Sequence, residues 1–510
     1  MSRVFSPMVR VMLGFVLLVL YLVPLGQAGT GIVDRQVSRA GHPMTLLVPD
    51  SRWQVERHAD EHTDEASDAL LTHPGEPMPA IILVHGFAGS RQMMAAYGYT
   101  LAHAGYAVVM LDLPGHGRNR APFARDANVA AIGEAFEVLQ GEPEVDISRV
   151  GLLGHSMGAE AVLRAASESP ERYRATVAVS PAYTTVSAVT PRNLQLQAGT
   201  WEPDFLETAE QLLADAGGAN ADFANGRARS LVAVERAEHI GIVFRNSSHR
   251  AARDWFDLAF EYQSAGSNDH RDWRLLGWLL HVAGWFLVAS AIGPAYRREA
   301  SLEVDVVRRP NHWLGLLGAP FVATGIVLLL DPFVAVRSLG GVMVGGGLAF
   351  WFLAAGTLFL LVAYRHGLPG GGDLIRGFGL FLFLAVAVGM TGHLAWTNWA
   401  LTPERLARWP IFALACTPWF VATEFGQGDP RGVSRWLWWG AQVASVSAAL
   451  LLLARMVPGM GIIVLILPLL PLYFAMFVYL GGKVRRPWAF GLGCGLFFGW
   501  VLTVAFPILG

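Results

Sequence analysis

Cysteine and charge are the two features that this chain has least of. It contains two cysteines, Cys416 and Cys494, both inside apolar runs, so it offers no disulfide framework, no C-x-x-C zinc site and no cysteine nucleophile. Of its 510 residues 15% are charged, and the formal net charge is −2. It also has no basic stripe with interleaved aromatic residues, which excludes nucleic-acid binding. We expect neither a metal ion nor a cofactor.

Apolar residues make up 53% of the chain, and their distribution divides it near residue 274. Before that point charges, histidine and proline are scattered as in a soluble domain. After it, apolar runs of about 18 to 25 residues follow one another, long enough to cross a bilayer as helices. A chain of this length also exceeds what one hydrophobic core usually organises. We therefore expect a soluble domain over residues 30–272 and a membrane domain over residues 273–510.

The second half of the chain is predicted to form eight membrane helices. They are expected near residues 275–295, 312–331, 338–363, 376–397, 409–425, 436–454, 459–480 and 488–509. The segment 409–425 contains Pro418 and ends at Glu424, so a re-entrant segment is the alternative there. Intramembrane polar residues such as His393 and Glu424 are few, and we interpret them as packing residues rather than as a pathway.

The N-terminus resembles an export signal. Residues 1–29 combine Arg3 and Arg10 with an apolar run over 11–25. The run is either cleaved near residues 27–29 or kept as an anchor, the interpretation we favour, which brings the expected membrane helices to nine. In both cases the following segment is exported. The result is an integral, multi-pass protein of a bacterial cell membrane with its soluble domain on the extracytoplasmic side.

Basic residues in the short loops support the same orientation. The loops assigned to the cytoplasm hold Arg297, Arg298, Arg308, Arg309, Arg365, Arg431, Arg435, Lys483, Arg485 and Arg486. The opposite loops hold Arg337, Arg405, Arg408 and Arg455. The excess on the first set predicts that the soluble domain lies outside.

Short apolar runs alternate with amphipathic segments between residues 30 and 272. Strands are predicted at 35–40, 44–48, 80–86, 106–115, 149–156, 175–182, 193–199 and 230–239, with helices between most of them. The polar, acidic stretch 56–68 is predicted to be a solvated loop. This order is typical of an α/β domain whose mostly parallel sheet is covered by helices on both faces.

The most informative motif is Gly154-His155-Ser156-Met157-Gly158, set between a strand-like and a helix-like run. It matches G-x-S-x-G, the sharp strand-to-helix turn that lifts a serine hydroxyl above the edge of a sheet. Ser156 is therefore the candidate nucleophile.

A serine hydroxyl is a poor nucleophile unless a histidine accepts its proton and a carboxylate orients that histidine. The strand 193–199 is followed by Glu202 and Asp204, and the strand 230–239 ends at His239. His249 is the alternative histidine, but it lies inside or at the start of a predicted helix, too far from the strand end.

In these residues and their order, the chain resembles the esterase and lipase-like branch of the α/β-hydrolase superfamily over about residues 40–262. In that family the order is serine, acid, histidine, as it is here. The family's Gly-x-x-Asp/Glu step falls on residues 199–202, which favours Glu202 as the acid and leaves Asp204 as the alternative.

The resemblance also implies an oxyanion hole made of backbone N–H groups. Met157, the residue after the nucleophile, supplies one donor. The segment that begins His85-Gly86-Phe87 resembles the family's His-Gly loop, which makes Phe87 the second donor. Gly86 allows the tight turn, and His85 is expected to stabilise the loop. The turn 113–117 after Asp112 resembles another family loop and is interpreted as structural.

About ten residues separate the strands 175–182 and 193–199, where many lipases insert a helical cap, so the site is either open or covered by the membrane domain. We expect a membrane-anchored serine hydrolase that cleaves carboxylic esters of lipids or acylated envelope components through an acyl-enzyme. The substrate and the bilayer are the expected partners. The alternatives are a serine peptidase and a membrane carrier or sensor with an accessory hydrolase domain.

Overall fold

The computed structural model describes residues 6–50, 77–262, 264, 270–298, 310–363, 368–427, 433–484 and 486–510. The predicted acidic loop and several of the basic loop residues counted above lie outside these ranges: Arg3, Arg308, Arg309, Arg365, Arg431 and Arg485. The chain forms two compact units. A sheet unit holds Tyr21–Gly277 and Gly392–Asn398, and a helical unit holds Met1–Leu20, Trp278–Thr391 and Trp399–Gly510.

The sheet unit is built on eight strands in the order β1-β2-β4-β3-β5-β6-β7-β8. Their bounds are β1 Ile32–Arg39, β2 His42–Pro49, β3 Met78–Val84, β4 Ala107–Leu111, β5 Val145–His155, β6 Ala175–Val179, β7 Leu194–Gly199 and β8 Arg229–Val234. β2 pairs antiparallel with β1 and β4, and every later pairing is parallel. The predicted mostly parallel α/β sheet is confirmed.

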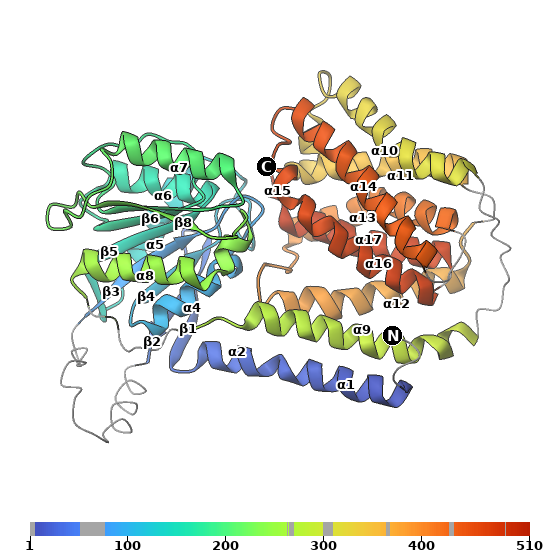
Figure 1. Ribbon diagram of the computed structural model, residues 1–510, viewed down its shortest axis with the longest axis horizontal. Coiled ribbons are helices and arrows are strands. Elements are labelled where there is room, and N and C mark those ends of the chain that lie inside the picture. Colours follow the sequence, from blue (N-terminus) through green and yellow to red (C-terminus); the bar gives the residue numbers. More distant parts are fainter. Residues whose placement is uncertain are drawn as a thin grey trace. The chain divides into compact units, whose positions relative to one another are not determined.

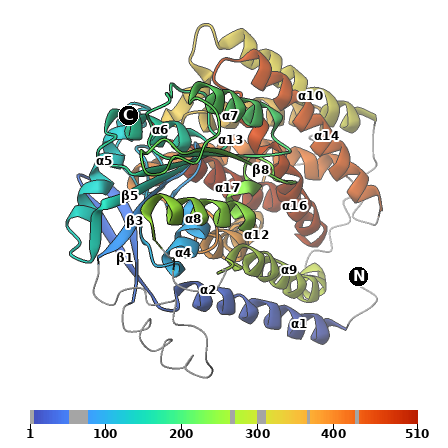
Figure 2. The same ribbon diagram turned by 60° about the vertical axis from the view of Figure 1, so that its left-hand side comes forward.

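Helices cover both faces of this sheet (Figures 1 and 2). α4 (Ala95–His103) and α8 (Asn246–Phe260) pack on one face; α5 (Ala127–Gln140), α6 (Met157–Glu168) and α7 (Pro203–Asp215) pack on the other. β3 explains the division: Ile81 and Leu83 point into the first core, and Ile82 and Val84 into the second. A fully apolar strand fits because successive side chains point to opposite, equally buried faces.

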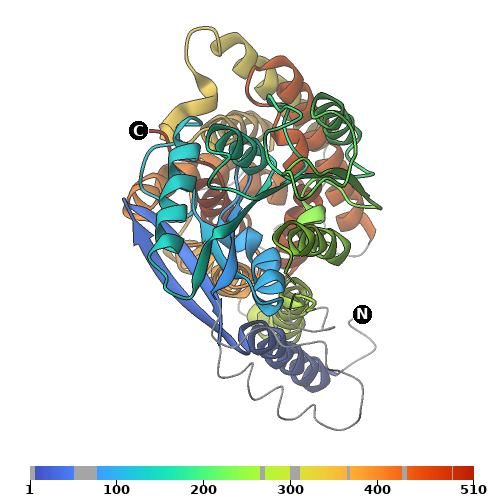
Figure 3. The same ribbon diagram turned by 90° about the vertical axis from the view of Figure 1, so that its left-hand side faces the viewer.

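The candidate site residues lie on loops that leave the carboxyl ends of the parallel strands. Parallel strands end at one edge of a sheet, so loops after β3, β5, β7 and β8 meet there. β6 and β7 are joined by residues 180–193, which form neither helix nor strand. No helical cap is inserted at this point. The long antiparallel strands β1 and β2, blue in Figure 3, form the edge of the sheet.

The other unit consists mainly of helices. Their bounds are α1 Pro7–Leu20, α9 Arg274–Arg298, α10 Pro310–Leu330, α11 Gly345–Ala363, α12 Gly371–Leu384, α13 Pro403–Gln427, α14 Val433–Met456, α15 Ile463–Ile466, α16 Leu470–Val484 and α17 Pro487–Ala505. α9 begins within the sheet unit, and α2 (Leu22–Gly29) belongs to it.

Eight helical segments among the described residues are long and apolar enough to span a membrane. One is the N-terminal segment Pro7–Gly29, and the other seven match seven of the eight helices predicted after residue 273. The eighth prediction, 409–425, lies within α13, which is not among these segments. Two prolines and several charged residues make α13 less apolar than its neighbours, although much of it is buried.

Glycines allow α13 and α17 to approach closely. Gly491, Gly495 and Gly499 recur every fourth residue on α17, and a Cβ on each would lie within 3 Å of backbone atoms of α13. Residues four apart share one face of a helix. Small residues on such a face are the usual means by which membrane helices pack closely.

Candidate active site

Ser156 stands at the turn between β5 and α6. Its backbone has φ 55° and ψ −118°, a conformation that a residue with a side chain rarely adopts. Its N–H donates to the carbonyl oxygen of Val179 at 2.9 Å, which fixes the turn to the neighbouring strand. Strained backbone of this kind is typical of functional sites held by their surroundings, and here it raises the serine above the end of the strand.

At Gly154 and Gly158, the two glycines of the motif, there is no room for a side chain. A Cβ on Gly154 would lie 2.2 Å from the carbonyl oxygen of Gly158, and one on Gly158 would lie 2.3 Å from that of Val84. Both obstacles are backbone atoms, which cannot move aside as a side-chain tip can. The glycines therefore allow α6 to begin directly against β3 and β5.

Ser156, His239 and Glu202 form a continuous chain of hydrogen bonds. His239 Nε2 lies 3.0 Å from Ser156 Oγ, and His239 Nδ1 lies 2.7 Å from Glu202 Oε2. All three side chains are buried. A carboxylate can only accept, so Nδ1 carries the proton and Nε2 is left to accept the serine proton. The structure thus brings together the three residues that the sequence selected.

The two candidate acids differ in position. Glu202 Oε1 accepts hydrogen bonds from Ser180 Oγ at 2.6 Å and from the Gly199 N–H at 2.5 Å, so its carboxylate is held on both oxygens. Asp204 is exposed in the first turn of α7, where a negative charge favours the helix. Glu202 faces His239, and Asp204 does not.

Two further histidines border this site without belonging to the chain of hydrogen bonds. His155 Nε2 donates to the backbone carbonyl of His239 at 2.8 Å. Burial, and then the neighbouring His239, lower the pKa of His155 to about 3, so it is a neutral support for the histidine loop. His249, the alternative base, is buried in α8, where Nε2 donates to the carbonyl of Val243 at 2.8 Å and the ring contacts Tyr97.

The loop over residues 85–91, here called the β3 loop, passes directly against the nucleophile. A Cβ on Gly86 would lie 3.0 Å from Ser156 Cβ, which explains why glycine is needed there. His85 Nδ1 donates to the carbonyl of Gly86 at 2.8 Å, and Nε2 accepts from the Leu113 N–H at 3.1 Å. Burial lowers the pKa of His85, so the ring is neutral and makes both bonds at once. Phe87 follows Gly86, with its ring against those of His116 and Phe123.

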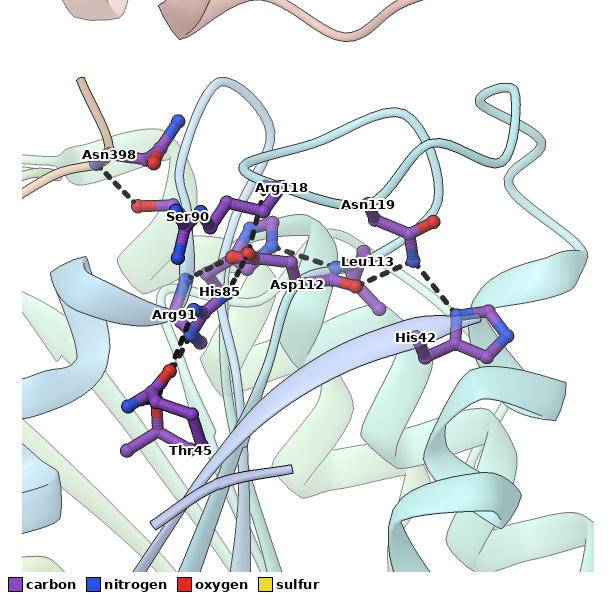
Figure 4. A network of polar contacts seen from close by, with 11 residues as sticks. His42, Thr45, His85, Ser90, Arg91, Asp112, Leu113, Arg118, Asn119 and Asn398 are labelled. Carbon is purple, nitrogen blue, oxygen red and sulfur yellow. Dashed lines mark hydrogen bonds and ion pairs between the residues drawn. The ribbon is translucent and has the colours of Figure 1, made fainter. Parts of the chain in front are cut away.

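An ion pair that sequence reasoning missed anchors the end of the same loop (Figure 4). Arg91 and Asp112 are both buried; their side chains form a salt bridge, and the Arg91 N–H also donates to Asp112 at 2.9 Å. The Arg118 N–H donates to the other carboxylate oxygen at 2.9 Å. Arg91 further donates to Thr45 Oγ1 at 3.0 Å. The available signal was Asp112 itself, a carboxylate at the end of an apolar strand, which must be paired when buried.

The described part of the chain contains no group of three or more His, Cys, Asp or Glu side chains that could hold a metal ion.

Comparison with known families identifies the sheet unit. Residues 79–259, about a third of the chain, match the family described as alpha/beta hydrolase fold. The order of strands, the turn at Ser156 and the helices on both faces agree with this match. The sheet unit is therefore an α/β-hydrolase domain, and the resemblance to that superfamily is confirmed.

Curated relatives match only parts of the chain. An uncharacterized protein of Mycobacterium tuberculosis strain H37Rv is 32% identical over 92 residues, which are 18% of this chain and 33% of that protein. The dihydrolipoyllysine-residue acetyltransferase component of the acetoin cleaving system of Cupriavidus necator is 32% identical over 101 residues, 20% of this chain and 26% of that protein. The chain thus spans a third or less of the length of these relatives.

Solved structures match over a similar region. Dienelactone hydrolase from Anabaena variabilis is 19% identical, with 46% of this chain and 99% of that chain covered and a TM-score of 0.33. Monoacylglycerol lipase from Paleococcus ferrophilus is 18% identical, with 36% and 96% covered and a TM-score of 0.28.

Proposed function

We propose that the protein is a membrane-anchored serine hydrolase that cleaves carboxylic esters through an acyl-enzyme. The observation that carries the proposal is the hydrogen-bonded chain from Ser156 through His239 to Glu202 at 3.0 and 2.7 Å, buried at the carboxyl end of the sheet. In this arrangement each group has the partner that its chemical role needs.

The proposed mechanism follows from this geometry. Ser156 Oγ attacks the ester carbonyl while His239 Nε2 takes its proton, and the carboxylate of Glu202 stabilises the imidazolium that forms. The backbone N–H groups of Phe87 and Met157 meet the negative oxygen of the tetrahedral intermediate. His239 then returns the proton to the departing alkoxide, which leaves as the alcohol. A water molecule activated in the same way hydrolyses the acyl-enzyme and restores the serine.

The surroundings of the site favour esters that partition into membranes. Trp201 follows the carboxyl end of β7, directly before Glu202, and its side chain is 65% exposed. In the part of the chain that the structure describes, eight helical segments are long and apolar enough to cross a membrane. The proposed arrangement is an N-terminal anchor or signal over 1–29, a hydrolase domain over 30–272 outside the cell membrane and a membrane domain over 273–510. The class of substrate is therefore lipid or acylated envelope esters.

Ester hydrolysis by the full-length protein in lipid nanodiscs tests this proposal. We expect wild type to hydrolyse p-nitrophenyl esters, with kcat/KM rising with acyl length, and to release fatty acid from lipid esters in the bilayer. Ser156→Ala should lose both activities. Cleavage of peptide amides with no ester hydrolysis would favour a serine peptidase. Ester hydrolysis that survives in Ser156→Ala would reject the assignment of the nucleophile.

A further inference from the structure

The loop between two apolar helices of the second half of the chain belongs to the hydrolase domain. The sequence predicts a membrane helix over 376–397, but the helical segment that begins with α12 has its last π turn at Ala385–Met390, shortly before residue 392. Residues Gly392–Asn398 then group with the sheet unit. We call this segment the 392–398 loop. It lies at the β3 loop, as Asn398 beside Ser90 in Figure 4 shows.

The contact between the two loops is a buried hydrogen bond. The backbone N–H of Asn398 donates to Ser90 Oγ at 2.9 Å, and both residues are 1% exposed. Ser90 precedes the short helix Arg91–Met94, where a serine hydroxyl usually accepts from a backbone N–H of the first turn. Here it makes no such capping bond. The hydroxyl instead accepts a hydrogen bond from the backbone N–H of Asn398, which is 308 residues away in the sequence.

Other contacts fix the 392–398 loop to the hydrolase domain. The carbonyl oxygen of Leu394 accepts from the guanidinium of Arg274 at 3.4 Å, and Arg274 is itself paired with Asp272 at 2.5 Å. Burial lowers the pKa of His393, with Arg118 and Arg91 adding to the effect, which places this side chain within range of the cations around Asp112. The loop is therefore bonded to the hydrolase domain at Leu394 and at Asn398.

Three residues of the β3 loop form hydrogen bonds or an ion pair with other segments through their side chains, and one of these bonds joins the 392–398 loop. His85 bonds the Leu113 N–H, and Arg91 bonds Asp112; these partners lie within the hydrolase sequence. Ser90, the third, bonds Asn398. The loop so held carries Gly86 against Ser156. An oxyanion hole acts through donors that are already in place before the reaction, so its strength depends on how firmly this loop is fixed.

We propose that the 392–398 loop positions the oxyanion loop, so that the membrane half of the chain contributes a structural part of the active site. This inference rests on the proposed serine hydrolase function. Ser90 and Asn398 are positioning residues: neither touches the reacting atoms. Loosening the loop weakens bonds that strengthen in the transition state, which lowers kcat more than it changes KM.

Two pairs of variants of the full-length protein test the proposal. Ser90→Ala removes the acceptor, and Ser90→Thr keeps it. Asn398→Pro removes the donor N–H, and Asn398→Ala keeps it. We expect Ser90→Ala and Asn398→Pro each to lower kcat about tenfold, less than the loss of a whole oxyanion donor, with KM within about twofold. Ser90→Thr should stay near wild type, and Asn398→Ala, which keeps the N–H but loses the buried side chain, should retain more activity than Asn398→Pro. The two damaging changes combined should be no worse than either alone, because they break one bond.

Hydrogen exchange gives a readout that does not depend on catalysis. Ser90→Ala should speed exchange of the amides over residues 86–91 while the thermal midpoint falls by only a few degrees. Unchanged exchange and unchanged kcat in Ser90→Ala would overturn the proposal, as would equal losses in Ser90→Thr. If Ser156→Ala kept its ester hydrolysis, the proposed function would fail while the exchange result still decided whether the 392–398 loop holds the β3 loop.

Discussion

The two units of the molecule treat buried polar side chains in different ways. In the hydrolase domain several of them gather at the site, where Ser156, His239 and Glu202 bond one another and Arg91 pairs with Asp112 at the end of the adjoining loop. Each group there has a side-chain partner that can exchange a proton with it or orient it. Convergence of this kind is what chemistry requires.

In the described part of the helical unit the buried arginines lie apart from one another, and they bond mainly to backbone. Arg10 donates to the carbonyl and the hydroxyl of Ser290 at 2.8 and 3.0 Å. Arg405 donates to the carbonyl of Phe506 at 2.9 Å. Arg435 pairs with Glu424 at 2.9 Å and also donates to the carbonyl of Val478 at 2.6 Å.

The same rule, that a buried polar group must be paired, therefore has two uses. In the hydrolase domain it builds a reactive site, and in the helical unit it ties helices together. We accordingly place the chemistry in the hydrolase domain and keep the interpretation of Glu424 as a packing residue.

The largest expected effect separates two buried histidines of the hydrolase domain. His239→Gln should lower kcat by about 10⁴ or more, because the base of a triad acts as a unit with its nucleophile. His249→Gln should leave kcat within about threefold, since His249 bonds Val243 and lies outside the chain of hydrogen bonds. Steady-state ester hydrolysis measures both. Comparable losses in the two variants would reject the assignment of the base.

The next effect distinguishes the two acids. Glu202→Gln should lower kcat by about 10² to 10⁴, because a neutral amide no longer stabilises the imidazolium. Asp204→Asn serves as the matched control and should change kcat less than twofold, because Asp204 is exposed. If Asp204→Asn were the damaging change, the acid would have been placed at the wrong residue.

A third change acts on the helical unit. A Cβ on Gly495 would lie 2.2 Å from Thr417 Oγ1 and 2.8 Å from Thr417 Cα, whereas one on Gly440 would meet nothing within 4 Å. Gly495→Ala should therefore destabilise the bundle by about 1–3 kcal/mol, and Gly440→Ala should not. Thermal unfolding in detergent measures the difference. Equal midpoints would mean that α13 and α17 are packed less closely than the structure describes.

The smallest effect concerns acid stability. Burial lowers the pKa of His249 to about 4, below its ordinary value of 6.5, so folding favours the neutral ring. The resulting stability is fully present above pH 6.5 and is lost as pH falls through the window from 6.5 to about 4. This single group adds a slope of up to about 1.4 kcal/mol per pH unit there. His249→Gln should flatten the dependence of the unfolding free energy on pH in this window. An unchanged slope would mean that the His249 ring is not buried in the folded protein.

Much of the hydrolase domain could be predicted from the sequence because its strands and its nucleophile turn are specified by residues that are close together in the chain. Most strands are short apolar runs, the nucleophile turn is a contiguous motif, and His239 lies in the loop after β8, which ends at Val234, earlier than the predicted strand 230–239. The preference for Glu202 came from spacing, and the geometry agrees with it.

The missed parts depend on contacts between distant residues. Nothing near Ser90 in the sequence indicates that its hydroxyl bonds an amide at residue 398. The pairing of Arg91 with Asp112 likewise needs β3 and β4 side by side. The end of the predicted helix 376–397 was wrong because hydropathy continues past residue 390, where the backbone turns to bond the hydrolase domain.

The most direct test of the account is the site at which a fluorophosphonate reacts with the full-length protein in membranes. Such a probe forms a covalent bond with an activated serine. Peptide mass spectrometry should find the adduct on Ser156, with labelling lost in Ser156→Ala and strongly slowed in His239→Gln. An adduct on another serine, or equal labelling of Ser156→Ala, would contradict the central claim that this turn carries the nucleophile.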